Sequence, residues 1–255
     1  MTSVWFSVPV AILVFASGLL GLYLKRLLPD PHVEAARGMI AAVVGLVTLL
    51  LALVLGNIVG SVHGFYATQK SELDNLATKV LQLDIALAEY GDETKGFRAK
   101  LKEGMTRTYE MFWGPGNAAD SDPDALKVAA ALPNLRAIDA FLASLNPQTP
   151  AQRQAVSAAG ADAHLIQNLR IKMSLQLASP VSWPLLVIVV FWSMLLFCGF
   201  GLVSDANSTT VIALALGAFA VASAVFIIIE LSHPYTGMFR IPPAALEQTI
   251  AAIDK

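Results

Sequence analysis

Charged residues are scarce in this chain, at 14% of its 255 residues, whereas a soluble domain usually carries about 25%. The deficit is concentrated in four long stretches that are almost free of charge, and the mean hydropathy is +0.62. This distribution excludes an ordinary soluble protein. It predicts an integral membrane protein of the all-α class.

Cysteine is also scarce, and neither charge is in large excess. The single cysteine, Cys198, lies within an apolar run and has no second thiol with which to form a disulfide or a thiolate metal site. The formal net charge of -2 gives no indication of a polyanionic partner. We therefore expect no binding to nucleic acid.

Catalytic signatures are lacking as well. The four histidines are scattered without a partner at metal-ligand spacing, and there is neither a glycine-rich phosphate loop nor a serine nucleophile elbow. The acidic run Asp120, Asp122 and Asp124 lacks the central glycine and final glutamate of an EF-hand, so it is interpreted as a solvated loop. We expect no enzymatic activity, no metal and no cofactor.

What the sequence does contain is four apolar runs, each long enough to cross a hydrocarbon core about 30 Å thick, which takes roughly 20 helical residues. The first is interpreted as an uncleaved span rather than a signal peptide, because no basic residue precedes it and its apolar run is too long. Polar loops join the spans as two pairs in chain order. The runs cover residues 4–24, 39–62, 181–203 and 209–231.

The segment between the second and third spans, residues 64–180, is predicted to be a helical extramembrane domain, because no part of it alternates with period two. Its first helix, over 66–89, can continue the second span without a break. A narrow apolar seam indicates that this helix packs against others; the seam is Leu73, Leu76, Val80, Leu83 and Leu87. Further helices are expected over 93–112, 123–132 and 134–145, and from 150 toward the third span.

The resulting organisation is a membrane segment over 1–63, the helical domain, a second membrane segment over 181–231 and a tail over 232–255. Prolines and a glycine prevent the last span from continuing into the tail. We expect the tail to lie along the membrane interface with a short helix over 244–253. Packing of the tail against the helical domain is the open alternative.

An even number of spans places both termini and the helical domain on one side of the membrane. The first loop is basic and the N-terminus has no basic side chain, so the positive-inside rule favours an extracytoplasmic helical domain. Basic residues in the domain and the tail argue for the opposite orientation. The first set is Lys25, Arg26 and Arg37, and the second is Arg170, Lys172 and Arg240.

Polar residues at the ends of the second and fourth spans form the candidate functional site. These spans run in the same direction, so their ends lie at a similar depth. A carboxylate such as Glu230 is costly within a membrane, which points to an ion pathway or a proton-linked site. In the alternative, Glu230 only reaches the interface and accepts hydrogen bonds there. The candidate residues are Asn57, Ser61, His63, Glu230 and His233.

Small residues on the same two spans predict close contact between helices, whereas the first and third spans are interpreted as plain apolar helices. These faces can join helices of one subunit. They also offer more small-residue surface than one bundle needs, so we expect a homo-oligomer in the lipid bilayer. The packing candidates are Gly56, Gly60, Gly64, Ala213 and Gly217.

Three segments together resemble a bacterial four-span membrane family of unknown function that is often labelled bestrophin-like: LKRLLP at 24–29, QKSELDNL at 69–76 and ELSHPYTG at 230–237. The resemblance implies a bacterial inner-membrane protein and, by analogy with bestrophins, an oligomeric anion channel. The family commonly has an aspartate where this chain has Ser232, so an acidic pair with Glu230 is not expected.

Two hypotheses follow for function. The first is an oligomeric ion channel or channel-like protein with the second span near the pathway, since a pore gated by an apolar constriction needs few polar residues. The alternative is a non-conducting scaffold or sensor, anchored by its spans, whose helical domain binds a protein partner of unknown kind.

Overall fold

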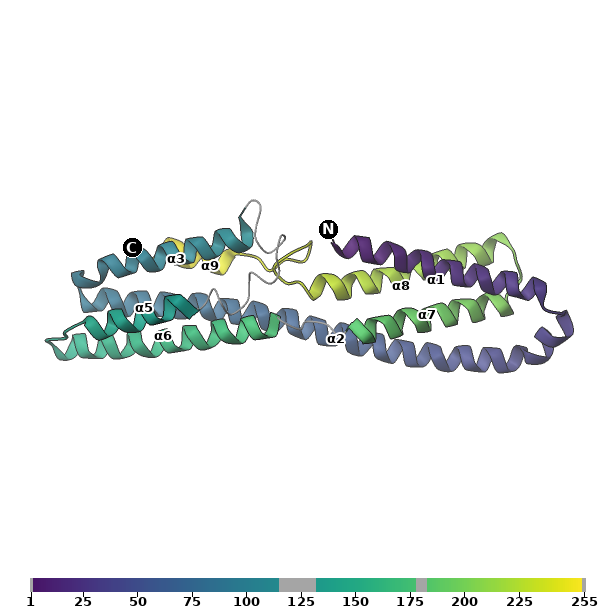
Figure 1. The fold of residues 1–255 in the computed structure, drawn as a ribbon, viewed down its shortest axis with the longest axis horizontal. Coiled ribbons are helices and arrows are strands. Elements are labelled where there is room, and N and C mark those ends of the chain that lie inside the picture. The colour runs from purple at the N-terminus through teal and green to yellow at the C-terminus, as the bar shows by residue number, and fades with distance from the viewer. Residues whose placement is uncertain (1, 115–131, 178–182, 254–255) are drawn as a thin grey trace. The chain divides into compact units, whose positions relative to one another are not determined.

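The computed structural model describes residues 2–114, 132–177 and 183–253, and every regular element within these ranges is a helix, which confirms the all-α class. Figure 1 shows the elements in chain order: α1 (Thr2–Leu27), α2 (Asp30–Tyr90), the 3-10 helix η1 (Asp92–Thr94), α3 (Lys95–Trp113), α5 (Leu132–Ser144), α6 (Pro150–Leu177), α7 (Trp183–Val203), α8 (Ser208–Leu231) and α9 (Ala244–Ala252). The acidic run at 120–124 and nearly all of the helix expected over 123–132 lie outside the described residues.

The chain forms two compact units. The membrane unit consists of residues 1–65 and 181–233, and the helical unit consists of residues 66–180 and 234–255. Four helices are long and apolar enough to cross a membrane, namely α1, α2, α7 and α8. Each unit has its own hydrophobic core.

Helix α2 belongs to both units and runs for 61 residues. This confirms the prediction that the second span continues into the first helix of the domain. The loop before it is shorter than the sequence indicated, because α2 already begins at Asp30. Pro31 falls in the first turn of the helix, where the missing N–H has no intrahelical acceptor in any case.

In the membrane unit, α1 packs against both α7 and α8 (Figure 1). The contact with α7 is made by glycines: a Cβ at Gly21 would lie 2.1 Å from the carbonyl oxygen of Cys198, and one at Gly201 would lie 2.3 Å from that of Gly18. Small residues let helix backbones meet in this way. The interpretation of the first and third spans as plain apolar helices was therefore wrong.

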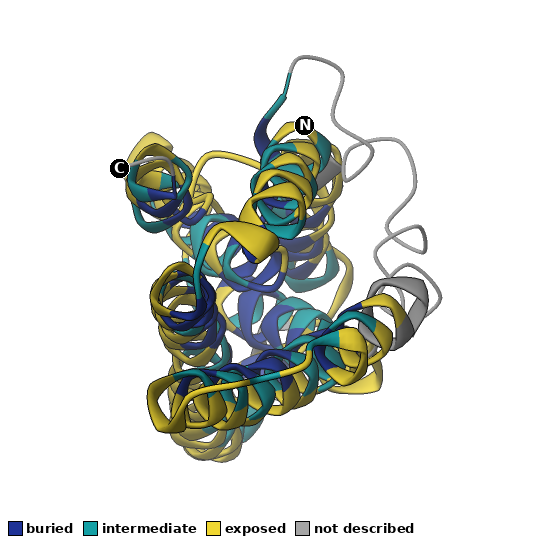
Figure 2. Cartoon of the chain, turned by 90° about the vertical axis from the view of Figure 1, so that its left-hand side faces the viewer, coloured by how far each residue is buried: buried dark blue, intermediate teal, exposed yellow. Residues whose placement is uncertain are grey.

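In the helical unit, the predicted apolar seam of α2 is buried, with Leu83 and Leu87 at 0% and 1% exposure. The opposing residues come from α3, from α5 and from an alanine face on α6. Figure 2, which has this unit nearest the viewer, shows buried segments on the inner sides of its helices and exposed segments outside. The alanines allow α6 to lie close to the seam.

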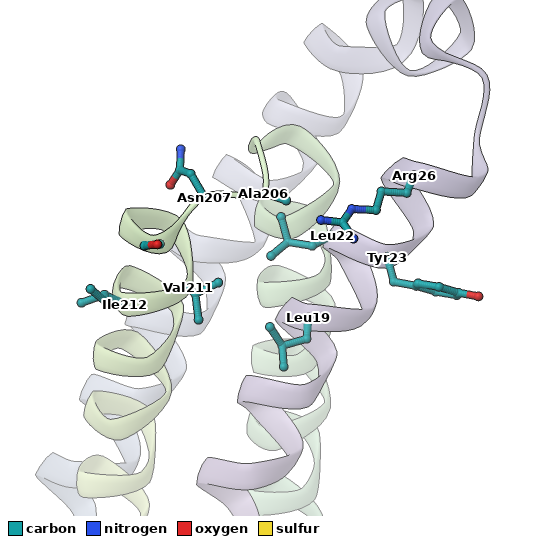
Figure 3. Close-up of a pocket in the computed structure, with 9 residues that line it drawn as sticks. Leu19, Leu22, Tyr23, Arg26, Ala206, Asn207, Val211 and Ile212 are labelled. Carbon is teal, nitrogen blue, oxygen red and sulfur yellow. The ribbon is translucent and has the colours of Figure 1, made fainter.

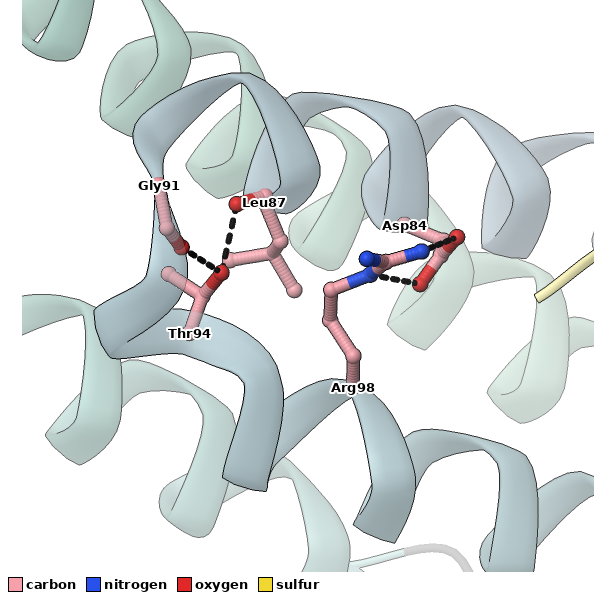
Figure 4. A network of polar contacts seen from close by, with 5 residues as sticks. All are labelled: Asp84, Leu87, Gly91, Thr94 and Arg98. Carbon is pink, nitrogen blue, oxygen red and sulfur yellow. Dashed lines mark hydrogen bonds and ion pairs between the residues drawn. The ribbon is translucent and has the colours of Figure 1, made fainter. Parts of the chain in front are cut away.

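The turn between α2 and α3 is held by a local polar network (Figure 4). Gly91 has a φ of 129°, a conformation that favours glycine. The Thr94 hydroxyl donates to the carbonyl oxygens of Leu87 at 2.5 Å and Gly91 at 2.8 Å. Beyond the turn, Arg98 donates Nε and Nη2 to the two carboxylate oxygens of Asp84, at 2.7 and 2.8 Å. These bonds link the end of α2 to η1 and to the first turns of α3.

The tail packs into the core of the helical unit, where Tyr235, Ile241, Leu246 and Ile253 are buried. The indole Nε1 of Trp113 donates to the carbonyl oxygen of Ile241 at 2.9 Å. This is the second of the two positions that the sequence left open. The helix expected over 244–253 is present as α9.

Candidate functional site

The part of α2 in the membrane unit is the least covered of the four spans. Only 6% of the most apolar window of α2 is buried within the chain, compared with 39% for α1, 39% for α7 and 33% for α8. Large apolar side chains are left exposed along it, including Met39, Leu46, Leu49 and Leu53. The chain therefore leaves one face of α2 to be covered by lipid or by another protein.

The covered and uncovered faces of α2 are on opposite sides of the helix. The buried residues Leu51, Ile58 and Val62 repeat at spacings of seven and four, so they share one face. At about 100° per residue, Gly60 and Asn57 lie on the far side from that face. Both are exposed.

Two adjacent stripes make up the uncovered face. The glycine stripe contains Gly56, Gly60 and Gly64 with Leu49 and Leu53, and a Cβ added at any of its three glycines would meet no atom within 4 Å. The polar stripe lies beside it, and its first three members are spaced by seven residues. It consists of Val43, Leu50, Asn57 and Ser61, all exposed.

The other two packing candidates, on α8, differ from the glycine stripe. A Cβ at Gly217 would lie 2.8 Å from Cζ of Phe197 on α7, so this glycine is used within the subunit. Ala213 is exposed.

The five polar candidates do not form one buried cluster. Asn57, Ser61 and His63 are exposed on α2, and His233 is exposed after the end of α8. Glu230 alone is buried, at 3% exposure. The uncovered face of α2 therefore presents neutral polar groups, and the carboxylate is enclosed in the subunit.

His233 and Ser232 close the end of α8. The Ser232 hydroxyl donates to the carbonyl oxygen of Ile228. Nδ1 of His233 lies 2.9 Å from the carbonyl oxygen of Ile229. The backbone N–H of His233 also donates to the carbonyl oxygen of Glu230, at 3.1 Å. Carbonyls of a last helical turn have no partner within the helix. These bonds give both residues a structural role that the sequence analysis did not assign.

In the described ranges, no three His, Cys, Asp or Glu side chains are grouped in a way that could hold a metal ion.

Four spanning helices and the separate helical unit define a multi-pass membrane protein. A comparison with known families matches residues 10–246 to the Bestrophin-like domain. The chain belongs to the Bestrophin-like family. Comparisons with curated proteins and with solved structures give no match.

Proposed function

We propose that the protein is a homo-oligomeric, channel-like membrane protein whose subunits meet through the uncovered face of α2. The observation that carries the proposal is the small buried share of α2, 6% of its apolar window, in a chain whose other three spans are covered several times more.

The polar stripe indicates that protein and water, rather than lipid alone, lie beside the uncovered face of α2. An amide such as that of Asn57 is costly to expose to hydrocarbon, because no group there can accept or donate a hydrogen bond. In an oligomer that surrounds an axial path, Asn57 and Ser61 would face water. Val43 and Leu50, two heptads and one heptad before Asn57, would form the apolar constriction that gates such a path by dewetting.

The glycine stripe would supply the contact between subunits. A four-residue repeat of glycine lets a neighbouring helix backbone come close, and in lipid this packing drives helix association. Within the described part of the subunit, a Cβ at Gly56, Gly60 or Gly64 would meet no atom within 4 Å. We assign this face to a second copy of α2, and the exposure of the adjacent leucines, Leu49 and Leu53, supports that assignment.

Glu230 has a supporting role in this proposal. It is buried within the membrane unit near the end of α8, whereas Asn57 is exposed on α2. Its charge would act on a conducting ion only through the body of the subunit. The selectivity of the path would therefore depend on Asn57 more than on Glu230.

Ion flux through liposomes that contain the purified protein tests the proposal. Asn57→Leu is expected to reduce flux about tenfold or more, since one polar group that replaces ion hydration in a narrow pore is worth more than about 1.4 kcal/mol. Phe219→Leu, at an exposed apolar position on α8, is the control and should leave flux unchanged. No flux from the wild type would favour the scaffold or sensor.

A further inference from the structure

A cleft of about 590 Å³ opens between the end of α1 and the start of α8, within the membrane unit (Figure 3). One part of its wall is apolar, from Leu19, Leu22 and Val211. The other part is polar and lies where the two helices end at the loop between α7 and α8, from Arg26, Asn207 and Ser208. The cleft therefore has a polar end and an apolar wall, which match the head group and the acyl chains of a phospholipid.

Two neighbouring cations at this end of α1 have different partners. Lys25 is held by the loop, with its Nζ 2.6 Å from Oδ1 of Asp205 and 3.1 Å from the carbonyl oxygen of Ser204. Its hydrogen bond lowers the pKa of Asp205, so that carboxylate stays ionised and paired. Arg26 has no hydrogen bond or ion pair with any described residue.

The guanidinium of Arg26 points across the mouth of the cleft toward Ala206 (Figure 3). The first turn of α8 begins on the opposite side. Asn207 caps that turn by accepting from the N–H of Thr210 at 2.8 Å, and the N–H groups of Ser208 and Thr209 precede the first intrahelical bond. Helix N-termini favour negative charge. An anion between α1 and α8 would thus lie between the full positive charge of Arg26 and the partial positive charge at the N-terminus of α8.

We propose that this cleft is a binding site for an anionic phospholipid. The phosphate is bound by the Arg26 guanidinium and the first turn of α8, and one acyl chain lies along Leu19, Leu22 and Val211. Lys25 and Asp205 hold the loop in place at the polar end. The site is independent of α2 and of any conduction path.

The lipid, rather than a free phosphate, is favoured by the wall below the charged end. Leu19 and Val211 are 38% and 36% exposed, and they continue the lipid-facing surface of their helices. Tyr23, at 60% exposure, adds an aromatic ring at the same level, where amphipathic rings are enriched at membrane interfaces. A soluble anion would use only the polar end.

Native mass spectrometry of the full chain in detergent, titrated with phosphatidylglycerol, tests the site. The wild type should retain this lipid in preference to phosphatidylcholine. Arg26→Gln should weaken retention about fivefold, the effect of about 1 kcal/mol for one basic residue at a membrane surface. Arg37→Gln is the matched control, because Arg37 is an exposed cation already near Glu34, at 3.5 Å. It should bind like the wild type.

Val211→Trp fills the apolar part of the cleft without altering charge, and it should also reduce retention while the melting temperature stays close to that of the wild type. Millimolar inorganic phosphate should not displace the lipid. The proposal is overturned if the two lipids bind equally well, if Arg26→Gln and Arg37→Gln behave alike, or if inorganic phosphate competes fully.

Discussion

Gly21 of α1 packs directly on the backbone of Cys198 in α7, so closely that a methyl group on Gly21 would lie 2.1 Å from the Cys198 carbonyl oxygen. Gly201 of α7 makes the reciprocal contact with α1, because a methyl group on Gly201 would lie 2.3 Å from the Gly18 carbonyl oxygen. Among the described glycines of the membrane unit, these two bring a Cβ closest to the backbone of another helix.

We predict that Gly21→Ala destabilises the membrane unit by about 1–3 kcal/mol, because the added methyl group forces two helix backbones apart. Thermal unfolding of the detergent-solubilised protein is the measurement. Gly45→Ala, on α2, is the control, since a Cβ there meets nothing within 4 Å. Equal melting temperatures for the two variants would show that the contact is not tight in the protein.

A second prediction concerns Arg98, which forms a bidentate pair with the buried carboxylate of Asp84. The side chain of Asp84 is 4% exposed, so Arg98→Met would leave a buried charge without its partner. The expected loss is about 3 kcal/mol in the unfolding free energy of the helical unit.

The control for that measurement is Lys95→Met. Lys95 and Asp92 also form an ion pair, but their side chains are 69% and 88% exposed, and exposed pairs contribute little. A chemical denaturation curve followed by circular dichroism should separate the two variants clearly. If Arg98→Met unfolds at the same denaturant concentration as Lys95→Met, the buried pair does not stabilise the turn.

A third prediction is a dependence of stability on alkaline pH that comes from Tyr235. Burial raises the pKa of this phenol well above 10.0, and its hydroxyl donates to Oε1 of Gln69 at 3.3 Å. A group whose pKa is raised by folding stabilises fully below its unfolded pKa, and that contribution is lost as pH rises above it. Stability should therefore fall above pH 10.

Tyr235→Phe should flatten this decline, since the phenol that must be kept neutral is removed. The measurement is the unfolding free energy of wild type and variant between pH 8 and pH 11.5, with every other tyrosine common to both chains. Parallel curves would contradict the prediction and would place the titrating group elsewhere.

Much of the local structure could be predicted from sequence, because it depends on residues close together in the chain. The seam from Leu73 to Leu87 identified the buried face of α2 in the helical unit, and the range 66–89 placed the end of that helix within one residue of Tyr90. The spans followed from length and apolarity alone. The start of α2 was missed because Pro31 can either end a helix or occupy its first turn.

The tertiary partners could not be predicted, because spacing along one helix does not say what lies opposite. Glycines occur at four-residue spacing on α2 and at shorter spacings in α1 and α7, yet of these only the glycines of α1 and α7 pack against another described helix. The contact of Tyr235 with Gln69 joins residues 166 positions apart. Equal depth suggested that Asn57 and Glu230 share one cluster, but the first is exposed and the second is buried.

The central proposal is that subunits associate through the glycine stripe of α2. The most direct test is the native mass of the protein in lipid nanodiscs, compared between wild type and Gly60→Leu. We expect a wild-type mass that is a multiple of the 27.1 kDa chain. Gly60→Leu should shift the mass toward the single chain without loss of melting temperature, because a Cβ at Gly60 would meet no described atom within 4 Å. A wild-type protein that remains a single 27.1 kDa chain in the bilayer would contradict it.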